Sequence, residues 1–149
     1  MKLLLINGPN LNMLGIREPE KYGSYTLSDI ENDIKNQAEA QQIYVECFQS
    51  NHEGEIIDKI QSTRGVFDGI IINSGGLTHT SVSIRDAISA VSIPTVEVHM
   101  TNIHAREDFC HVSMLSGVCC AQVVGFGKNS YKYAFDGFFS KCVNWCRTN

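Results

Sequence analysis

The stretch FDGIIINSGGLTHTSVSIRDAISAV, residues 67–91, decides the fold because it joins a buried strand to a helix. Its beginning, residues 67–72, is a short run rich in isoleucine, which is typical of a strand buried on both faces of a parallel sheet. Its end, residues 80–91, has the spacing of apolar residues that predicts a helix. A strand followed by a helix in this way indicates an α/β protein.

The same alternation of strands and helices runs along the rest of the chain. We predict strands over residues 2–6, 43–48, 67–72, 95–99 and 119–126, and helices over residues 27–40, 54–60, 80–91 and 131–146. Such alternation favours parallel strands with right-handed crossovers and helices on both faces. Five strands in this length predict a flavodoxin-like, doubly wound α/β sheet of order 2-1-3-4-5, in a single domain over residues 1–149.

Composition and charge limit the class of protein. The 149 residues are 43% hydrophobic and 19% charged, which is ordinary for one globular domain. A net charge of −4 disfavours general binding to nucleic acids or to anionic membranes, because both need a basic surface. The sequence has neither a long apolar span nor a signal-peptide pattern, and we therefore predict a cytoplasmic protein.

The cysteines raise the question of a metal site or of disulfides. They are Cys47, Cys110, Cys119, Cys120, Cys142 and Cys146. No two of them form a C-x-x-C pair, so the spacing typical of a zinc site is missing and we predict no metal. We predict reduced thiols, with the last four acting as small hydrophobic residues of the core.

Polar residues gather after three of the predicted strands. They are Asn7 and Asn10 after the first strand, Asn73, Gly75, Gly76, Thr78 and His79 after the third, and Glu97, His99, Thr101 and Asn102 at the fourth. Each one alone is also consistent with an ordinary turn. In doubly wound sheets, however, ligands bind outside the carboxyl ends of the strands, where the strand order reverses. We therefore expect a site between the first and third strands.

The residue types at this edge favour acid–base chemistry. The sequence has no G-x-S-x-G elbow, no phosphate-binding P-loop, and no G-x-G-x-x-G motif after the first strand. Histidine changes its charge near neutral pH, and Glu97 lies two residues before His99, on the same face of an extended strand. Tyr22 lies near Arg17, a cation that would stabilise a phenolate acting as base.

Two loops allow both a functional and an ordinary interpretation. Residues 15–25 are polar and rich in helix-breaking residues, so they form either a lid that closes over a substrate or a solvated surface loop. The stretch SGGLTHTS, residues 74–81, either binds an anion on its exposed N–H groups or is a turn in which Thr78 or Thr80 caps a helix.

Five segments in this order resemble a known family. They are NGPNLNMLGIREPEKYG (7–23), QSNHEGEIIDKI (49–60), IINSGGLTHTSVSIRDA (71–87), VEVHMTNIHARE (96–107) and VVGFG (123–127). Over nearly its full length the chain resembles the type II 3-dehydroquinate dehydratases. The resemblance implies a flavodoxin-like subunit, assembled as trimers packed into a dodecamer. It also implies dehydration of 3-dehydroquinate to 3-dehydroshikimate in the shikimate pathway, without metal or organic cofactor.

The resemblance implies roles for five catalytic residues. Tyr22 resembles the base that removes the proton beside the substrate ketone, and Arg17 resembles the cation that supports the phenolate and the resulting enolate. Asn10 would orient a water or hydroxyl that stabilises the enolate. His99, positioned by Glu97, resembles the general acid that protonates the departing hydroxyl.

The resemblance also implies a set of substrate-binding residues. Asn73 and His79 would hold substrate hydroxyls, and the backbone of Met100 and Thr101 would hold the carboxylate. Asp86 resembles a residue that reaches into the site of a neighbouring subunit.

Two further positions stand at the edge of the implied site. Arg106 would pair with acidic groups there. Cys110 occupies the place of an arginine, because this chain reads REDFCH where the family usually reads REPFRH. A thiol is a weaker donor than a guanidinium, and the substitution therefore predicts weakened substrate binding.

Other functions of the same fold fit the sequence less well. A flavin carrier needs a phosphate loop rich in Ser and Thr, which NGPNLNMLG lacks, and a phosphate-receiving module needs an Asp where Asn73 stands. One alternative stays open. It is a catalytically weakened homologue that acts as a ligand-binding or assembly protein, for which Cys110 is the supporting feature.

Overall fold

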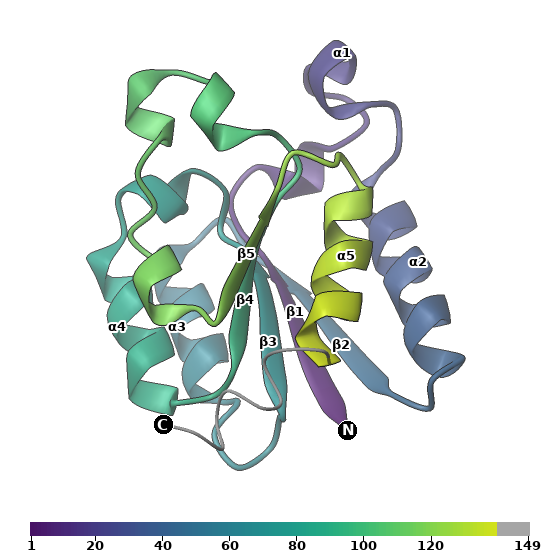
Figure 1. Cartoon of the computed structure of the whole chain (residues 1–149), viewed down its shortest axis with the longest axis vertical. Helices are drawn as coiled ribbons and strands as arrows, with labels where there is room; N and C mark the ends of the chain where they lie inside the picture. Colours follow the sequence, from purple (N-terminus) through teal and green to yellow (C-terminus); the bar gives the residue numbers. More distant parts are fainter. Residues whose placement is uncertain (140–149) are drawn as a thin grey trace.

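The computed structural model describes residues 1–139 as a five-stranded parallel sheet with helices on both faces (Figure 1). The strands are β1 (Lys2–Asn7), β2 (Tyr44–Gln49), β3 (Gly69–Asn73), β4 (Thr95–His99) and β5 (Ala121–Val124). Their order in the sheet is β2-β1-β3-β4-β5, and every pair is parallel. The predicted fold class and strand order are therefore confirmed.

The helices lie between the strands as predicted, with shifts at their ends. They are α1 (Pro19–Tyr22), α2 (Leu27–Glu39), α3 (Glu53–Gln61), α4 (Val82–Val91) and α5 (Asn129–Gly137). The helix predicted to begin at Thr80 begins at Val82, because residues 75–79 form a 3-10 turn, η2 (Gly75–His79). The predicted last helix extends past residue 139, and that part lies outside the described residues.

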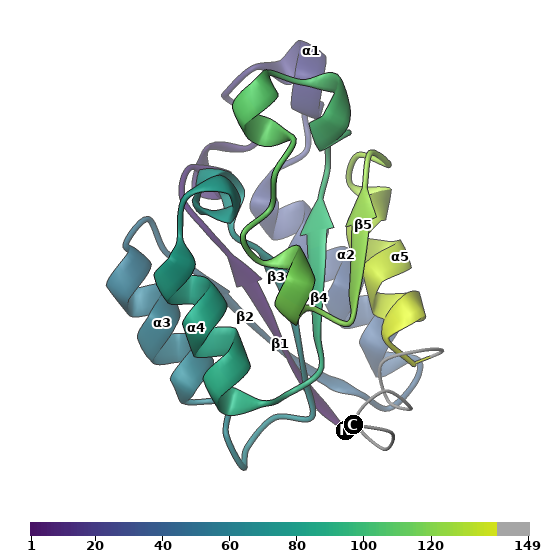
Figure 2. The ribbon, with the colours of Figure 1, turned by 60° about the vertical axis from the view of Figure 1, so that its left-hand side comes forward.

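The apolar residues of β1 form two cores, one on each face of the sheet. Leu3 and Leu5 face α2 and α5, whereas Leu4 and Ile6 face α3 and α4, because successive side chains of a strand point to opposite faces. Figures 1 and 2 show the two helix pairs on opposite sides of the sheet. All four side chains are buried. Burial on both faces explains why these strands read as continuous apolar runs.

Long connections gather at the carboxyl ends of the strands. The connection after β1 carries a 3-10 turn, η1 (Leu11–Met13), and α1, while η2 follows β3. The connection from β4 to β5 carries three more turns, η3 (Ile103–Ala105), η4 (Asp108–Cys110) and η5 (Ser116–Val118). Figure 2 shows α1 and the β4–β5 connection at the same end of the molecule. The fold therefore brings all three connections to one edge of the sheet.

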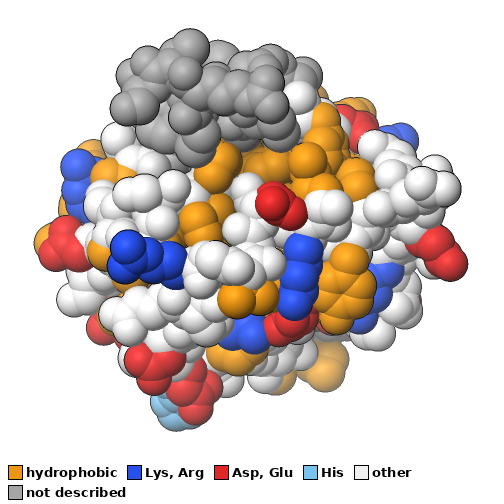
Figure 3. All heavy atoms as spheres, turned by 90° about the horizontal axis from the view of Figure 1, so that it is seen from below, with side chains coloured by type: hydrophobic (Ala, Val, Ile, Leu, Met, Phe, Trp, Pro, Cys, Tyr) orange, Lys and Arg blue, Asp and Glu red, His pale blue; other side chains and the backbone are white. Residues whose placement is uncertain are grey.

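The opposite end of the molecule carries charges of both signs. Seen from below, Lys and Arg side chains are interspersed with Asp and Glu and with hydrophobic residues (Figure 3).

Among residues 1–139, no helix combines the length and the apolar character that crossing a bilayer requires.

The cysteines differ in part from the prediction. Cys47, Cys110 and Cys119 are free thiols, as predicted. Cys120 is disulfide-bonded, so the prediction of a reduced thiol is wrong for this residue. Cys142 and Cys146 lie outside the described residues.

Candidate active site

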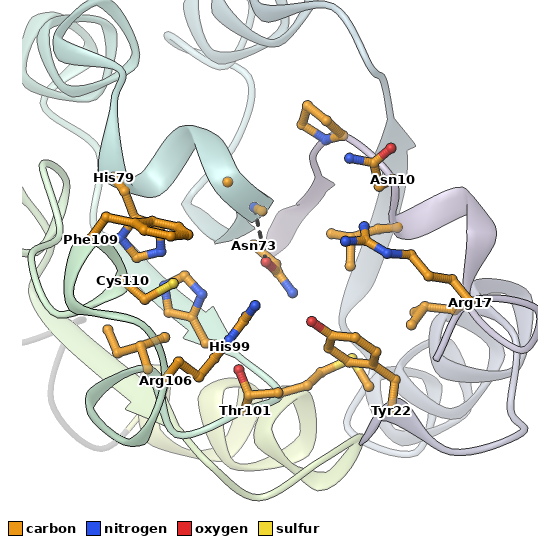
Figure 4. A pocket seen from close by; sticks show the side chains of 17 residues that line it. Asn10, Arg17, Tyr22, Asn73, His79, His99, Thr101, Arg106, Phe109 and Cys110 are labelled. Carbon is orange, nitrogen blue, oxygen red and sulfur yellow. Dashed lines mark hydrogen bonds between the residues drawn. The ribbon is translucent and has the colours of Figure 1, made fainter. Parts of the chain in front are cut away.

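A cavity of about 260 Å³ opens at the carboxyl ends of β1, β3 and β4. The predicted site residues that line it are Asn10, Arg17, Tyr22, Asn73, His79, His99, Met100, Thr101, Arg106 and Cys110. Figure 4 shows side chains from three separate connections turned toward this space. The cavity lies where the strand order reverses, which is the place where we expected a site from the sequence.

His99 and Glu97 form a buried pair on β4. His99 ends the strand with 6% of its surface exposed, and Glu97 is fully buried behind it. The Nε2 atom of His99 lies 2.7 Å from Oε1 of Glu97. The two side chains share one face of the strand because they are two residues apart. Glu97 does not line the cavity, so it reaches the reacting atoms only through His99.

Asn73 is held by a buried network that reaches α5. Its Nδ2 donates to the hydroxyl oxygen of Tyr131 at 2.8 Å, and that hydroxyl donates to Oδ1 of Asn7 at 2.8 Å. The backbone N–H of Gly75 donates to Oδ1 of Asn73 at 3.1 Å. Burial raises the pKa of Tyr131, which therefore keeps its proton. These contacts fix the amide of Asn73 at the cavity wall.

His79 faces His99 across the floor of the cavity. Its Nδ1 lies 2.7 Å from the carbonyl oxygen of Val112, and because a carbonyl only accepts, Nδ1 carries a proton. The two imidazole rings are stacked, with centroids 6.4 Å apart and 20° between their planes. Phe109 covers His79 from the other side with an edge-on contact at 6.4 Å. With Nδ1 bound to Val112, Nε2 is the nitrogen of His79 that is left for a contact within the cavity.

Tyr22 and Arg17 come from residues 15–25 and lie on the opposite wall from His99 (Figure 4). The segment is not a loop throughout, because it contains the short helix α1, which Pro19 begins and Gly23 ends. Glu18, just before α1, has a left-handed backbone with φ of 44°, and its carboxylate lies 3.4 Å from Nε of Arg17. The lid role stays a prediction.

Cys110 and Arg106 lie side by side in the β4–β5 connection. Cys110 is 2% exposed, and its thiol is 3.7 Å from Oε2 of Glu107. Burial raises the pKa of the Cys110 thiol, so the side chain is neutral. The Nε atom of Arg106 is buried without a hydrogen-bond partner among the described residues. This wall of the cavity therefore offers one guanidinium and one neutral thiol.

Asp86 does not reach the cavity of its own chain. It lies exposed on α4, apart from the residues that line the site.

Within residues 1–139, no group of three or more His, Cys, Asp and Glu side chains is placed to hold a metal ion.

The sequence did not indicate several contacts of the site. Ser113 and Gln122 both donate to Glu97, and Phe109 lines the cavity. Gln122 pairs in register with Glu97 across β4 and β5, which a strand alignment could have suggested. Ser113 and Phe109 lie on an irregular connection, where no periodicity indicates which way a side chain points.

Comparison with known proteins identifies the family of the chain. The family model described as "Dehydroquinase class II" matches residues 1–139. The 3-dehydroquinate dehydratase of Bacillus cereus (strain AH820) is 53% identical over 140 residues, which cover 94% of this chain and 96% of that protein. The type II dehydroquinase of Butyrivibrio crossotus is 49% identical, with a TM-score of 0.91 over 93% of this chain and 97% of that one.

A more distant relative has the same fold. The type II dehydroquinase of Propionibacterium acnes is 30% identical, with a TM-score of 0.86 over 99% of this chain and 97% of that one. Both the family match and the identities extend over most of the chain. The chain therefore belongs to the class II dehydroquinase family.

Proposed function

We propose that this chain dehydrates 3-dehydroquinate to 3-dehydroshikimate through an enolate, as a single catalytic domain over residues 1–149. The observation that carries the proposal is the placement of Tyr22 and His99 on opposite walls of one cavity (Figure 4). Removal of water from a hydroxyketone needs a base at the carbon beside the ketone and an acid at the departing hydroxyl. This cavity offers one candidate for each role.

Tyr22 is the proposed base. Its phenolate takes the proton from the carbon beside the ketone, and the electron pair moves onto the ketone oxygen to form an enolate. Arg17, on the same wall, supplies the positive charge that stabilises both anions. Asn10 orients a water or a hydroxyl toward the enolate oxygen. Preorganised donors of this kind stabilise charge where it develops.

His99 is the proposed acid. The enolate collapses to form the carbon–carbon double bond, the carbon–oxygen bond to the hydroxyl breaks, and the proton from His99 turns the departing hydroxide into water. Glu97, 2.7 Å from Nε2, stabilises the charged imidazole before it gives up its proton. General acid–base assistance typically contributes about 10²–10⁴-fold to the rate.

The other cavity residues are proposed to hold the substrate. Asn73 and His79 bind its hydroxyls, because both present fixed polar atoms to the cavity. The backbone of Met100 and Thr101 binds its carboxylate. Arg106 pairs with acidic groups at the edge of the site. No cofactor is needed for this reaction, because every step is a proton transfer or a bond rearrangement.

We propose that the subunits form trimers packed into a dodecamer in the cytoplasm. The exposed position of Asp86 on α4, away from its own cavity, supports a role in the site of a neighbouring subunit. Nucleic acids and membranes are not proposed as partners, because the net charge of the chain is −4.

The test is steady-state formation of the conjugated enone, followed by ultraviolet absorbance, from purified protein and 3-dehydroquinate. We expect saturable turnover that Tyr22→Phe and His99→Asn each reduce by at least about 10²-fold. Tyr44→Phe is the matched control, since Tyr44 is exposed on the edge strand β2, and it should leave kcat unchanged. Full activity of Tyr22→Phe would refute the role of Tyr22.

Cys110 favours a second candidate function, that of a weakened homologue which binds a ligand or serves an assembly. The buried, neutral thiol lies at the cavity wall, where the resemblance implies a substrate-binding arginine. This function requires that the folded protein binds 3-dehydroquinate in calorimetry but forms no enone at any substrate concentration. Measurable turnover excludes it.

A further inference from the structure

Ser113 donates its only hydroxyl proton to the buried carboxylate of Glu97. Its Oγ lies 2.8 Å from Oε1 and 3.0 Å from Oε2 of Glu97. The same oxygen accepts the backbone N–H groups of Leu115 at 3.1 Å and Ser116 at 3.0 Å. A serine hydroxyl has one proton and two acceptor positions, and both acceptor positions are occupied. The proton therefore has no other acceptor than Glu97.

Gln122 supplies a second donor to the same carboxylate. Its Nε2 lies 3.1 Å from Oε2 of Glu97, and the two residues are paired in register on β5 and β4. A fully buried carboxylate is costly unless donors surround it, and here donors reach both of its oxygens. Ser113 and Gln122 together therefore hold the plane of the Glu97 carboxylate in one orientation.

The contact with the Glu97 carboxylate decides which nitrogen of His99 carries the resident proton. An ionised carboxylate only accepts hydrogen bonds, so Nε2 of His99, 2.7 Å from Oε1, must be a donor. The neutral ring is thereby held in the Nε2–H tautomer. Nδ1 is left as the atom that gains and loses the transferable proton.

We propose that Ser113 is a positioning residue, assisted by Gln122, which sets the orientation of Glu97 and through it the tautomer of His99. The proposal rests on the function proposed for His99 as the acid. Ser113 lies outside the cavity lining, so we expect no contact between it and a bound substrate. Its removal should therefore act on the chemical step rather than on substrate binding.

The first test compares kcat and KM of three variants. Ser113→Ala should lower kcat by about ten- to a hundredfold, the range expected for a lost hydrogen bond to a charged group, with KM changed by less than about threefold. Ser113→Thr keeps the hydroxyl and should recover most of kcat. Ser116→Ala is the matched control, because Ser116 is exposed and, within residues 1–139, its hydroxyl hydrogen-bonds only to the carbonyl of Ser113 in the same turn.

A double-mutant cycle separates positioning from general stability. In the Glu97→Gln background, Ser113→Ala should change kcat by less than about threefold, because the carboxylate through which it acts is gone. If the double variant instead loses kcat by the product of the two single losses, the proposal is wrong. If Ser113→Ala does not fold, Gln122→Met removes the other donor with little change in size and should lower kcat in the same direction.

The tautomer itself can be measured without turnover. Nitrogen NMR of the ¹⁵N-histidine-labelled protein, at a pH where the ring is neutral, should show the Nε2–H form of His99 in the wild type. Ser113→Ala should show a mixture of tautomers. An unchanged tautomer together with an unchanged kcat would refute the role of Ser113. If the wild type shows no turnover, the proposed function fails, while the tautomer result still decides the inference.

Discussion

Gly8 and Ser74 are in backbone contact where the sheet reverses its strand order. A β-carbon on Gly8 would lie 2.5 Å from the carbonyl oxygen of Ser74. The N–H of Gly8 also donates to the carbonyl of Asn73 at 2.7 Å. The contact therefore joins the connections after β1 and β3, which both contribute residues to the cavity lining.

Gly8→Ala should destabilise the protein by about 1–3 kcal/mol, because the added methyl group forces two backbones apart. It should also raise KM, since Asn10 lies on the connection after β1 and Asn73 ends β3 directly before the other connection. Urea unfolding and steady-state kinetics measure the two effects. Gly54→Ala, in α3, is the control, because a β-carbon added there would meet no atom within 4 Å. A gain of about 0.5–1 kcal/mol in unfolding free energy is expected for it. Equal stabilities for the two variants would contradict this account.

Tyr131→Phe should cost about 1–3 kcal/mol of unfolding free energy, because it leaves polar atoms of Asn7 and Asn73 without partners in the core. KM should rise severalfold as the amide of Asn73 loses its fixed orientation. Tyr133→Phe, on the exposed side of the same helix, should change neither quantity. A Tyr131→Phe variant as stable as the wild type would show that the network adds nothing to the fold.

Alkaline pH should destabilise the wild type through Tyr131. Burial raises the pKa of this phenol in the folded state, whereas in the unfolded chain it ionises near about pH 10. The contribution of Tyr131 to the free energy of unfolding is therefore intact below about pH 10 and is lost as the pH rises further. Urea unfolding between pH 8 and 11 should show a steeper fall for the wild type than for Tyr131→Phe. If the stabilities of the two proteins fall in parallel with pH, ionisation of Tyr131 is not the cause.

Cys110→Arg should lower the KM for 3-dehydroquinate by about tenfold or more, with kcat changed much less. The new guanidinium would add charge-assisted donors where a neutral thiol now stands. Cys110→Ala should behave like the wild type, because the thiol is a weak donor. If the arginine variant changes neither constant, Cys110 does not limit substrate binding.

The sheet could be predicted from the sequence because its strands are buried on both faces. Burial makes β1 and β3 continuous apolar runs, and the strand order follows from the alternation of strands and helices. The residues at which the strands begin and end were less predictable. The apolar run over residues 119–126 forms a strand only over Ala121–Val124, because its ladder with β4 stops at His99 and Gly125 then turns the chain with φ of 91°.

The site could be predicted where its residues follow strands directly. Asn73 and His99 are placed by the ends of β3 and β4, and the carboxyl ends of parallel strands meet at one edge. Ser113 was not predicted, because the connection from β4 to β5 is irregular and its path depends on tertiary packing. The short helix α1 was missed too, since four residues are too few to produce a periodic pattern.

Tyr22 and His99 are carried by different kinds of structure. His99 ends a strand buried on both faces, whereas Tyr22 lies on a segment that joins the rest of the chain through Gly15 and Gly23, both with positive φ. Replacement of residues 15–25 would therefore change Tyr22 and its surroundings, and it would leave in place the buried strand that ends at His99.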